Sequence, residues 1–311
     1  DAKHRWGGWS HDGERFAFTS NRRDESVFDI YVQDRDGVGE EAELVYEGDG
    51  WLSVAGWSPD DSQLIVHQAY SGYDGDLYVL NIESGKIDHL TPHEGTVRYN
   101  SPNWGPDGEN LYLVTDRATD TLRLERLAVE SGEFAVVETE RRDHTGDEWN
   151  VGGLAVDEDS RRIVYGRNVE GYTEWTAGEL VAPDRIDPFP DPDLPRGVSG
   201  GVSFGPDGDR FAVTVTGDTE NANVYVVDAR SGAAERWTDA PTAGIPRETF
   251  VESELVHYPT FDGREIPAFF ALPETDTGNR ETPVIVDIHG GPESQRRPSF
   301  NSVKQYLLAN G

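Results

Sequence analysis

The sequence predicts a mainly β chain: a β-propeller of five recognisable four-stranded blades, followed by the first strands and helix of an α/β domain. Two observations predict the propeller: a turn motif that returns about every 48 residues, and short apolar runs between the turns. A third observation predicts the α/β start, because an apolar run leads directly into a His-Gly-Gly-Pro turn. We expect residues 1–249 to form the propeller repeats and residues 250–311 to begin the second domain.

The repeat is defined by a turn of the form Trp-Ser-Pro-Asp-Gly. Its copies begin at Trp9, Trp57, Trp104 and Phe204, and a degenerate copy begins at Val156. A second turn, Ser-Gly, keeps the same period. Pro presets φ and Gly supplies a positive φ, so each copy suits a tight turn between two strands.

Each repeat then supplies its strands in order. A first apolar run follows the turn, a second run comes next, and the Ser-Gly turn leads to a last strand. The first runs are 15–19, 63–66, 110–115, 162–165 and 210–215, the second are 29–33, 76–82, 122–129 and 223–228, and the last include 86–90 and 234–238. Units of this length with four strands each indicate propeller blades.

The aromatic residue before each turn is expected to pack between blades. We therefore place Trp9, Trp57 and Trp104 in the core. A propeller normally closes its ring so that no sheet edge is left exposed. Residues 3–9 already form the first strand of a unit, and no closing strand remains at residue 249. We expect the ring to be incomplete, with further blades upstream of a chain that is a fragment.

In residues 250–311 the periodicity stops. Residues 255–258 predict a strand, and residues 259–262 and 264–272 predict a hairpin around the Asp-Gly turn at Gly263. The β-branched run Val284–Ile288 predicts a buried strand of a parallel sheet. Residues 302–310 have helical apolar spacing, and Gly311 follows as the stop signal. Strands, a Gly-rich turn and a helix are how an α/β-hydrolase sheet begins.

The turn His289-Gly290-Gly291-Pro292 predicts part of an oxyanion hole. Two glycines let the backbone turn without a Cβ clash and approach a substrate carbonyl closely. Their N–H groups can then face the negative charge that develops in acyl transfer, which is usually the largest catalytic contribution.

The whole pattern resembles the prolyl oligopeptidase family of serine peptidases, and within it the acylaminoacyl-peptidase-like branch. Propeller repeats, the hairpin segment 260–267 and His289-Gly290-Gly291-Pro292 occur here in that family's order. The resemblance covers nearly the whole chain. The Trp-Ser-Pro-Asp-Gly repeats alone are less specific, since TolB-type propellers share them.

The resemblance implies roles for the turn residues. The backbone N–H of Gly291 would serve the oxyanion hole, with Gly290 as second choice, while His289 and Pro292 would shape the turn. The family's Ser, Asp and His triad would lie beyond residue 311, so the nucleophile is not in this chain and the chain alone is expected to be inactive. The propeller would restrict access to short peptides, and no cofactor would be needed.

Several other residues resemble functional groups. Ser199 and Ser203 both fall in G-x-S-x-G sequences, but they lead into a blade turn and not into the strand–helix elbow that a nucleophile needs. Among acidic residues that could bind a peptide amino terminus, Glu148, Glu170 and Glu174 remain open. No His pair has the spacing of a zinc site, and we expect no metal.

Composition excludes some classes of function. With no Cys there are no disulfides, thiol nucleophiles or Cys–zinc sites. The net charge of −32 opposes nucleic-acid binding, and no apolar run is long enough to span a membrane. Abundant carboxylates with few Lys favour a halophilic, haloarchaeal protein of a salt-rich cytoplasm.

The sequence leaves open whether the protein forms a homo-oligomer. Alternatives to the peptidase are a TolB-like binding or scaffold module and an esterase-type acyl hydrolase on the same fold.

Overall fold

The computed structural model describes residues 2–139, 149–273, 283–291 and 294–310. The chain divides into two compact units, residues 1–165 with 177–188, and residues 166–176 with 189–311. The expected boundary between residues 249 and 250 stays a prediction.

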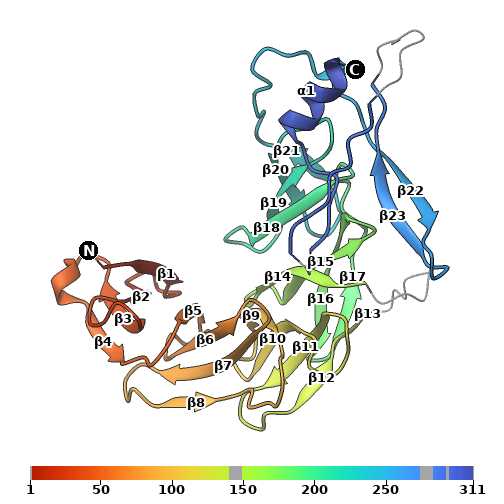
Figure 1. Cartoon of the computed structure of the whole chain (residues 1–311). Helices are drawn as coiled ribbons and strands as arrows, with labels where there is room; N and C mark the ends of the chain where they lie inside the picture. Colours follow the sequence, from red (N-terminus) through yellow and green to blue (C-terminus); the bar gives the residue numbers. More distant parts are fainter. Residues whose placement is uncertain (1, 140–148, 274–282, 292–293, 311) are drawn as a thin grey trace. The chain divides into compact units, whose positions relative to one another are not determined.

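The first three sheets are four-stranded and antiparallel, and their strands pair in chain order (Figure 1). The 3-10 helix η1 (Gly39–Glu41) precedes β4. The strands are β1 (His4–Trp9), β2 (Arg15–Ser20), β3 (Asp29–Asp34) and β4 (Glu43–Tyr46); β5 (Leu52–Trp57), β6 (Gln63–Ser71), β7 (Asp74–Asn81) and β8 (Ile87–His89); and β9 (Tyr99–Trp104), β10 (Asn110–Thr115), β11 (Arg123–Ala128) and β12 (Phe134–Val136). We refer to these sheets as blades 1, 2 and 3.

The next two sheets, blades 4 and 5, continue the repeat. Blade 4 has the order β13-β17-β16-β15-β14, with β13 parallel to β17, and blade 5 has the order β18-β19-β20-β21. Their strands are β13 (Glu138–Thr139), β14 (Val151–Asp157), β15 (Arg162–Val169), β16 (Tyr172–Ala182) and β17 (Arg185–Pro188), then β18 (Val198–Phe204), β19 (Arg210–Thr216), β20 (Asn223–Asp228) and β21 (Ala234–Arg236). The propeller prediction is confirmed, with the correction that blade 4 has a fifth strand.

The repeated turn has a common internal structure. In blade 2, Ser58 Oγ donates to Asp60 Oδ1 at 2.6 Å and closes the turn. Gly13 and Gly108 have φ of +69° and +67°, and Asp61 takes the same conformation at +58°. Asp tolerates this left-handed region better than most residues, which is why the motif persists where its Gly is lost.

The hydrophobic core of the first unit lies between consecutive blades. Trp57 is 3% exposed, its Nε1 donates to the carbonyl oxygen of Gly8 at 3.0 Å, and Trp104 is 2% exposed. The core prediction is confirmed for both. It is wrong for Trp9, which is 49% exposed, because no described strand of the first unit covers the face of blade 1 on which it lies.

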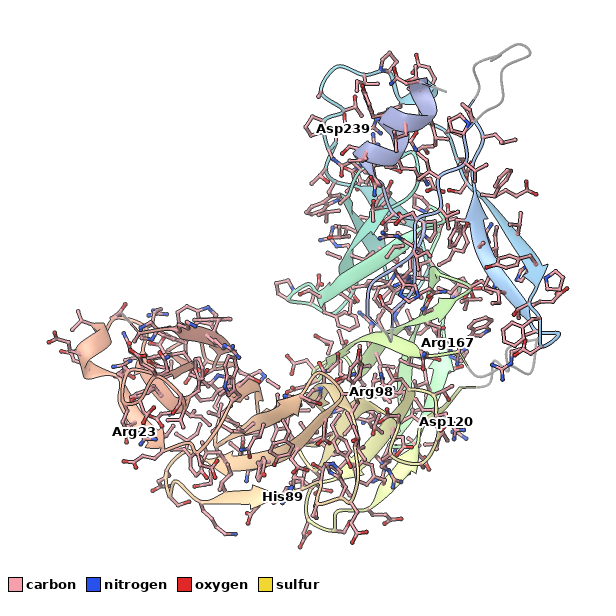
Figure 2. All side chains as sticks on the ribbon, viewed as in Figure 1. Arg23, His89, Arg98, Asp120, Arg167 and Asp239 are labelled. Atoms are coloured by element: carbon pink, nitrogen blue, oxygen red, sulfur yellow. The ribbon has the colours of Figure 1, made fainter. Side chains whose placement is uncertain are left out.

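Buried carboxylates lie near the start of the third strands of blades 1 and 2. Asp29, at the start of β3, pairs with Arg23 at 2.7 Å and accepts from the backbone N–H of Gly48 at 2.9 Å. Asp76 in β7 accepts from Thr91 Oγ1 at 2.9 Å and contacts His89 at 3.0 Å. Figure 2 labels Arg23 and His89. Both carboxylates are buried, and buried carboxylates need such partners.

In residues 250–311, β22 (Glu254–Pro259) and β23 (Glu265–Phe270) form a hairpin with Gly263 at φ +84°, and η2 (Arg247–Thr249) precedes it. The predicted turn at Gly263 is confirmed, but the arm that pairs with β23 is the strand expected at 255–258 and not residues 259–262, because pairing ends at Pro259 and Glu265 and leaves 260–264 as the turn. The predicted helix is α1 (Ser302–Asn310). Gly311 lies outside the described residues. The predicted buried strand at 284–288 is wrong: these residues are exposed and belong to no described sheet, because no described strand supplies hydrogen-bond partners alongside them.

Candidate functional site

The candidate site is the segment His289–Gly291, which follows an exposed apolar run. The Nδ1 of His289 donates to the carbonyl oxygen of Gly290 at 2.8 Å. Gly291 has a φ of +151°, which L side chains rarely adopt, whereas a Cβ on Gly290 would meet no atom within 4 Å. Within the described residues no hydrogen bond uses the N–H of either glycine. Pro292 lies outside the described residues. The oxyanion role of Gly291 and Gly290 stays a prediction.

An ion pair spans this turn. Asp287, two residues before His289, pairs with Arg296. Both side chains are more than half exposed, so the pair contributes little free energy by itself. It connects a residue before the turn to a residue after it.

The residues after the turn are held by the β15–β16 hairpin of blade 4. Arg297 donates through Nε to the carbonyl oxygen of Gly171 at 2.8 Å and through Nη2 to Thr173 Oγ1 at 2.9 Å. Asn168 Nδ2 donates to Gln295 Oε1 at 2.8 Å. Burial of the guanidinium lowers the pKa of Arg297, which indicates a desolvated anchor and not a surface contact.

The same hairpin also contacts the hairpin formed by β22 and β23. Glu170, with a φ of +49°, pairs with His257 at 2.9 Å, and Tyr172 packs edge-on against Phe269 at 5.7 Å. Gly171 has a φ of +92°, a conformation that favours glycine, and a Cβ there would lie 3.0 Å from the Phe269 ring. Glu170, one of the three acidic residues considered for binding a peptide amino terminus, is thus paired with His257.

Of the two remaining candidates, Glu174 is exposed and Glu148 lies outside the described residues. Neither position identifies a binding site for a peptide amino terminus. The choice between Glu174 and Glu148 stays open.

Helix α1 is held through polar contacts by the β19–β20 loop of blade 5 and by the segment that precedes β22. Lys304 Nζ pairs with Asp218 and donates to Ser253 Oγ at 2.8 Å. Gln305 Nε2 donates to the carbonyl oxygens of Asp218 and Val251, both at 2.9 Å, and its side chain is the buried one of the helix.

The apolar face of α1 is turned to solvent. Val303 and Tyr306 are 64% and 68% exposed. Sequence reasoning missed these polar anchors, because a period of apolar residues directs attention to the apolar face. The only signal in the sequence was the pair Lys304-Gln305, two polar residues between the apolar Val303 and Tyr306.

Ser199 and Ser203 both lie within β18, which continues into β19 through a turn. Ser199 Oγ accepts from Trp175 Nε1 at 2.9 Å. Neither serine therefore lies between a strand and a helix, and the prediction that they are not in a nucleophile elbow is confirmed.

Among the described residues no group of three or more His, Asp or Glu side chains could hold a metal ion. In that same part of the chain no helix has the length and apolar character needed to cross a membrane.

Comparison with known proteins places the fold. The family model PD40, TolB beta propeller domain, matches residues 7–172, more than half of the chain. The chain belongs to the TolB beta propeller domain family. This TolB-type chain is 29% identical over 91 residues to the Tol-Pal system protein TolB of Francisella tularensis, covering 29% of the chain and 20% of that protein. It is 24% identical over 250 residues to dipeptidyl-peptidase 5 of Porphyromonas gingivalis, covering 76% of the chain and 34% of that protein.

Solved structures share the fold of the TolB-type chain at low identity. A prolyl endopeptidase superposes with a TM-score of 0.74 at 16% identity, covering 100% of the chain and 45% of that protein. Puromycin hydrolase superposes with a TM-score of 0.76 at 17% identity, covering 99% of the chain and 49% of that protein. The chain thus spans between a fifth and a half of the length of these proteins.

Proposed function

We propose that this chain is the propeller and the start of the α/β-hydrolase domain of a serine-type peptidase of the prolyl oligopeptidase family. The whole protein would cleave short peptides through an acyl-enzyme: a serine attacks, a histidine moves the proton, and the N–H of Gly291 stabilises the oxyanion. The triad would lie in a part of the protein outside these 311 residues, so the chain alone would be inactive.

One observation carries the proposal: the His289–Gly291 turn has backbone N–H groups that no described residue uses, and it is anchored to a propeller hairpin through Arg297. An oxyanion hole needs donors held in place before the substrate arrives. The fold shared with a prolyl endopeptidase over the whole chain supports the same conclusion.

The propeller would restrict entry to short or unstructured peptides. Support comes from the hydrogen bonds of Gln295 and Arg297 to the β15–β16 hairpin, which connect the residues after the candidate turn to a blade. Hydrolysis of a folded protein at the rate of a short peptide with the same cleavage site would contradict this role.

We also propose that the protein works in a salt-rich cytoplasm. The net charge is −32, with 59 acidic and 27 basic residues. At low ionic strength such a surface repels itself, and salt screens that repulsion. The melting temperature should therefore rise steadily between 0.1 M and 3 M KCl, and a melting temperature that does not change with salt would contradict the proposal.

The test compares the 311-residue chain with the protein expressed from its natural coding sequence on both sides. The longer protein should hydrolyse a chromogenic short peptide and lose that activity on treatment with a serine-directed phosphonate, while the 311-residue chain should show no turnover. Serine-reagent-sensitive turnover by the shorter chain would overturn the assignment.

A variant pair then tests the turn. In the longer protein, Gly291→Ala should lower kcat by about 10²–10³, the usual cost of losing one oxyanion donor, because a side chain at φ +151° displaces the N–H. Gly290→Ala is the matched control and should change kcat little, since its Cβ meets no atom. Equal effects of the two substitutions would remove Gly291 from the site.

Two other functions remain as candidates. The TolB match covers the propeller alone, which favours a binding or scaffold module; absence of any hydrolase activity in the longer protein would support that reading. A substrate panel of peptides against simple esters separates the peptidase from an esterase-type acyl hydrolase on the same fold.

A further inference from the structure

A histidine at the junction of blades 2 and 3 faces hydrogen-bond acceptors at both of its ring nitrogens. His93 lies in the segment 90–98, which connects β8 of blade 2 to β9 of blade 3, and 12% of its side chain is exposed. Its Nε2 lies 3.0 Å from Asp74 Oδ1. Its Nδ1 lies 3.0 Å from the carbonyl oxygen of Thr91 and 3.2 Å from Asp76 Oδ1.

These contacts need a proton on each ring nitrogen. A neutral imidazole donates through one nitrogen and accepts through the other, whereas an imidazolium donates through both. In a neutral ring one nitrogen lone pair would point at an oxygen that can only accept. Burial lowers the pKa of His93, but the hydrogen bonds to the Thr91 carbonyl and to Asp74 outweigh it, and the net shift is upward. The geometry and the direction of the shift both describe a ring held as a cation.

The two carboxylates have enough other donors to remain ionised. Asp74 Oδ1 also accepts from the backbone N–H of Val97 at 3.1 Å, and this bond, followed by the one from His93, lowers the pKa of Asp74. Asp76 has three further partners, which are Tyr70 Oη and Thr91 Oγ1 at 2.9 Å and His89 Nε2 at 3.0 Å. Burial raises the pKa of Asp76, but these three partners outweigh it and the net shift is downward. The proton shared with Asp74 and Asp76 therefore belongs to His93.

The other titratable groups around His93 leave its charge unbalanced by any second cation at Asp74. On β6, burial lowers the pKa of His67, so that ring is neutral. His89, labelled in Figure 2, stacks on Tyr78 and reaches Asp76 through Nε2, a contact that a neutral ring can make. Glu94, the next residue in the segment, is exposed.

On the blade 3 side the charges are already paired. The ring of Tyr99 in β9 packs edge-on against His93 at 5.6 Å, and burial raises the pKa of Tyr99 to about 12. The charged groups next to Tyr99 form two ion pairs at 2.7 Å, Arg98 with Asp116 and Arg117 with Glu125. The protonation of His93 is thus what decides the charge balance at this junction.

The segment that His93 holds contributes to the core between the two blades. Leu90 and Val97, on either side of His93 in the sequence, are both 8% exposed and belong to the hydrophobic cluster shared by blades 2 and 3. The backbone N–H of Leu90 donates to the carbonyl oxygen of Leu77 at 2.9 Å, and that of Gly75 donates to the carbonyl oxygen of Val97 at 3.2 Å. His93 therefore fastens the middle of a segment whose two ends are packed in the core.

We propose that His93 is a pH-dependent clasp between blades 2 and 3. As an imidazolium it binds Asp74 through one nitrogen and Thr91 and Asp76 through the other. As a neutral ring it has to give up the contact at one nitrogen, and the segment 90–98 loosens. The inference holds whether or not the protein is a peptidase.

The direction of the pH effect follows from the shift. The pKa of His93 in the folded chain lies above the unfolded value of 6.5. The stabilisation is therefore fully present below about pH 6.5 and is lost as pH rises through the folded pKa. The clasp is closed on the acidic side of this range and opens on the alkaline side.

The first test reads the protonation state of each ring in the folded 311-residue chain. Two-bond proton–nitrogen NMR spectra distinguish an imidazolium from either neutral tautomer, and His93→Gln and His67→Gln assign the two signals. The His93 ring should pass from imidazolium to neutral with a midpoint above pH 6.5, while the His67 ring stays neutral there. Asp74→Asn should move the His93 midpoint to lower pH, because the amide carries no charge. A midpoint at or below pH 6.5, or one that Asp74→Asn leaves unchanged, would overturn the proposal.

The second test measures whether that proton holds the junction. Amide exchange at Gly75, Leu90 and Val97 is followed across the His93 midpoint at constant salt and corrected for the intrinsic rate at each pH. Protection should fall by about tenfold as the ring becomes neutral, the scale of one hydrogen bond to a charged group, while the amides of blade 5 should not change. His93→Gln should have the low protection at every pH.

His89→Gln is the matched control, because it removes a neighbouring histidine and leaves both nitrogens of His93 with their acceptors; it should keep the pH-dependent step. Since His11 is present in every variant, its own titration does not distinguish them. A step that persists in His93→Gln or disappears in His89→Gln would assign the transition to another group. Equal loss of protection in all blades would show global unfolding and would also contradict a clasp.

Discussion

Two apolar runs of this chain have similar composition and opposite structures. Leu64, Ile65 and Val66 lie in β6 and are 0% exposed. Val284, Ile285 and Val286 are 85%, 65% and 76% exposed and belong to no described sheet. In β6 the backbone pairs with β5 on one side and β7 on the other, whereas the second run has no described strand beside it.

The difference shows what an apolar run specifies. β-Branched and aliphatic residues fit a pleated, buried surface, but a strand also needs neighbours that accept and donate its backbone hydrogen bonds. A repeat supplies those neighbours from a few residues away, because each turn brings the next strand back. The run at residues 284–288 has no such local partner.

The largest expected effect tests this contrast directly. Leu64→Ala should lower the free energy of unfolding by about 2–5 kcal/mol, because it leaves a cavity between blades 1 and 2. Val286→Ala should change it by less than about 0.5 kcal/mol, because the side chain is already in water. Urea denaturation of both variants is the measurement. A comparable loss in Val286→Ala would mean that the run has a partner in solution.

A smaller effect is expected at the anchor that follows the open run. Arg297→Ala removes hydrogen bonds from a desolvated guanidinium to Gly171 and Thr173, each worth about 1.5–3 kcal/mol when one partner is charged. Amide hydrogen exchange in residues 283–300 should accelerate by about tenfold or more, with little change in blades 1–3.

The control for the anchor is Arg264→Ala, since the Arg264 side chain is 83% exposed and should leave exchange unchanged. Arg297→Lys should give an intermediate result, because an ammonium group cannot reproduce the two-point contact. Uniform acceleration throughout the chain would show global destabilisation and not release of an anchor.

The smallest effect concerns a histidine in the repeat region. The carboxylate of Glu158, 3.4 Å from Nε2, and then that of Asp61 raise the pKa of His11 to about 9, against desolvation. The folded pKa lies above the unfolded value of 6.5, so the stabilisation is fully present below about pH 6.5 and is lost as pH rises through 9. With 47% of the side chain exposed, it should amount to less than about 1 kcal/mol.

The measurement is the melting temperature from pH 6 to pH 10 for the wild type and His11→Gln. The wild type should be the more stable at low pH, and the difference should shrink towards pH 10. A difference that grows with pH would contradict the raised pKa. Gln keeps the backbone N–H that donates to Asp61 at 2.9 Å, so the comparison isolates the charge.

The repeat made much of the fold predictable. The runs at 110–115 and 223–228 coincide with β10 and β20, and helix 302–310 coincides with α1. The fifth strand of blade 4 was not predictable, because β13 is two residues long and pairs with β17, which lies more than 40 residues away. The candidate turn was found from its glycines, while its anchor Arg297 was not, since a lone arginine in a polar loop carries no local signal.

The sequence by itself determined the blades, their turns and the glycines of the candidate site, because turn geometry and strand periodicity are local properties of neighbouring residues. Only the tertiary structure decided which equivalent positions are buried. Trp57 is in the core and Trp9 in solvent, although both occupy the same place in the repeat. Burial depends on a second surface, and no residue can specify by its own identity whether that surface is present.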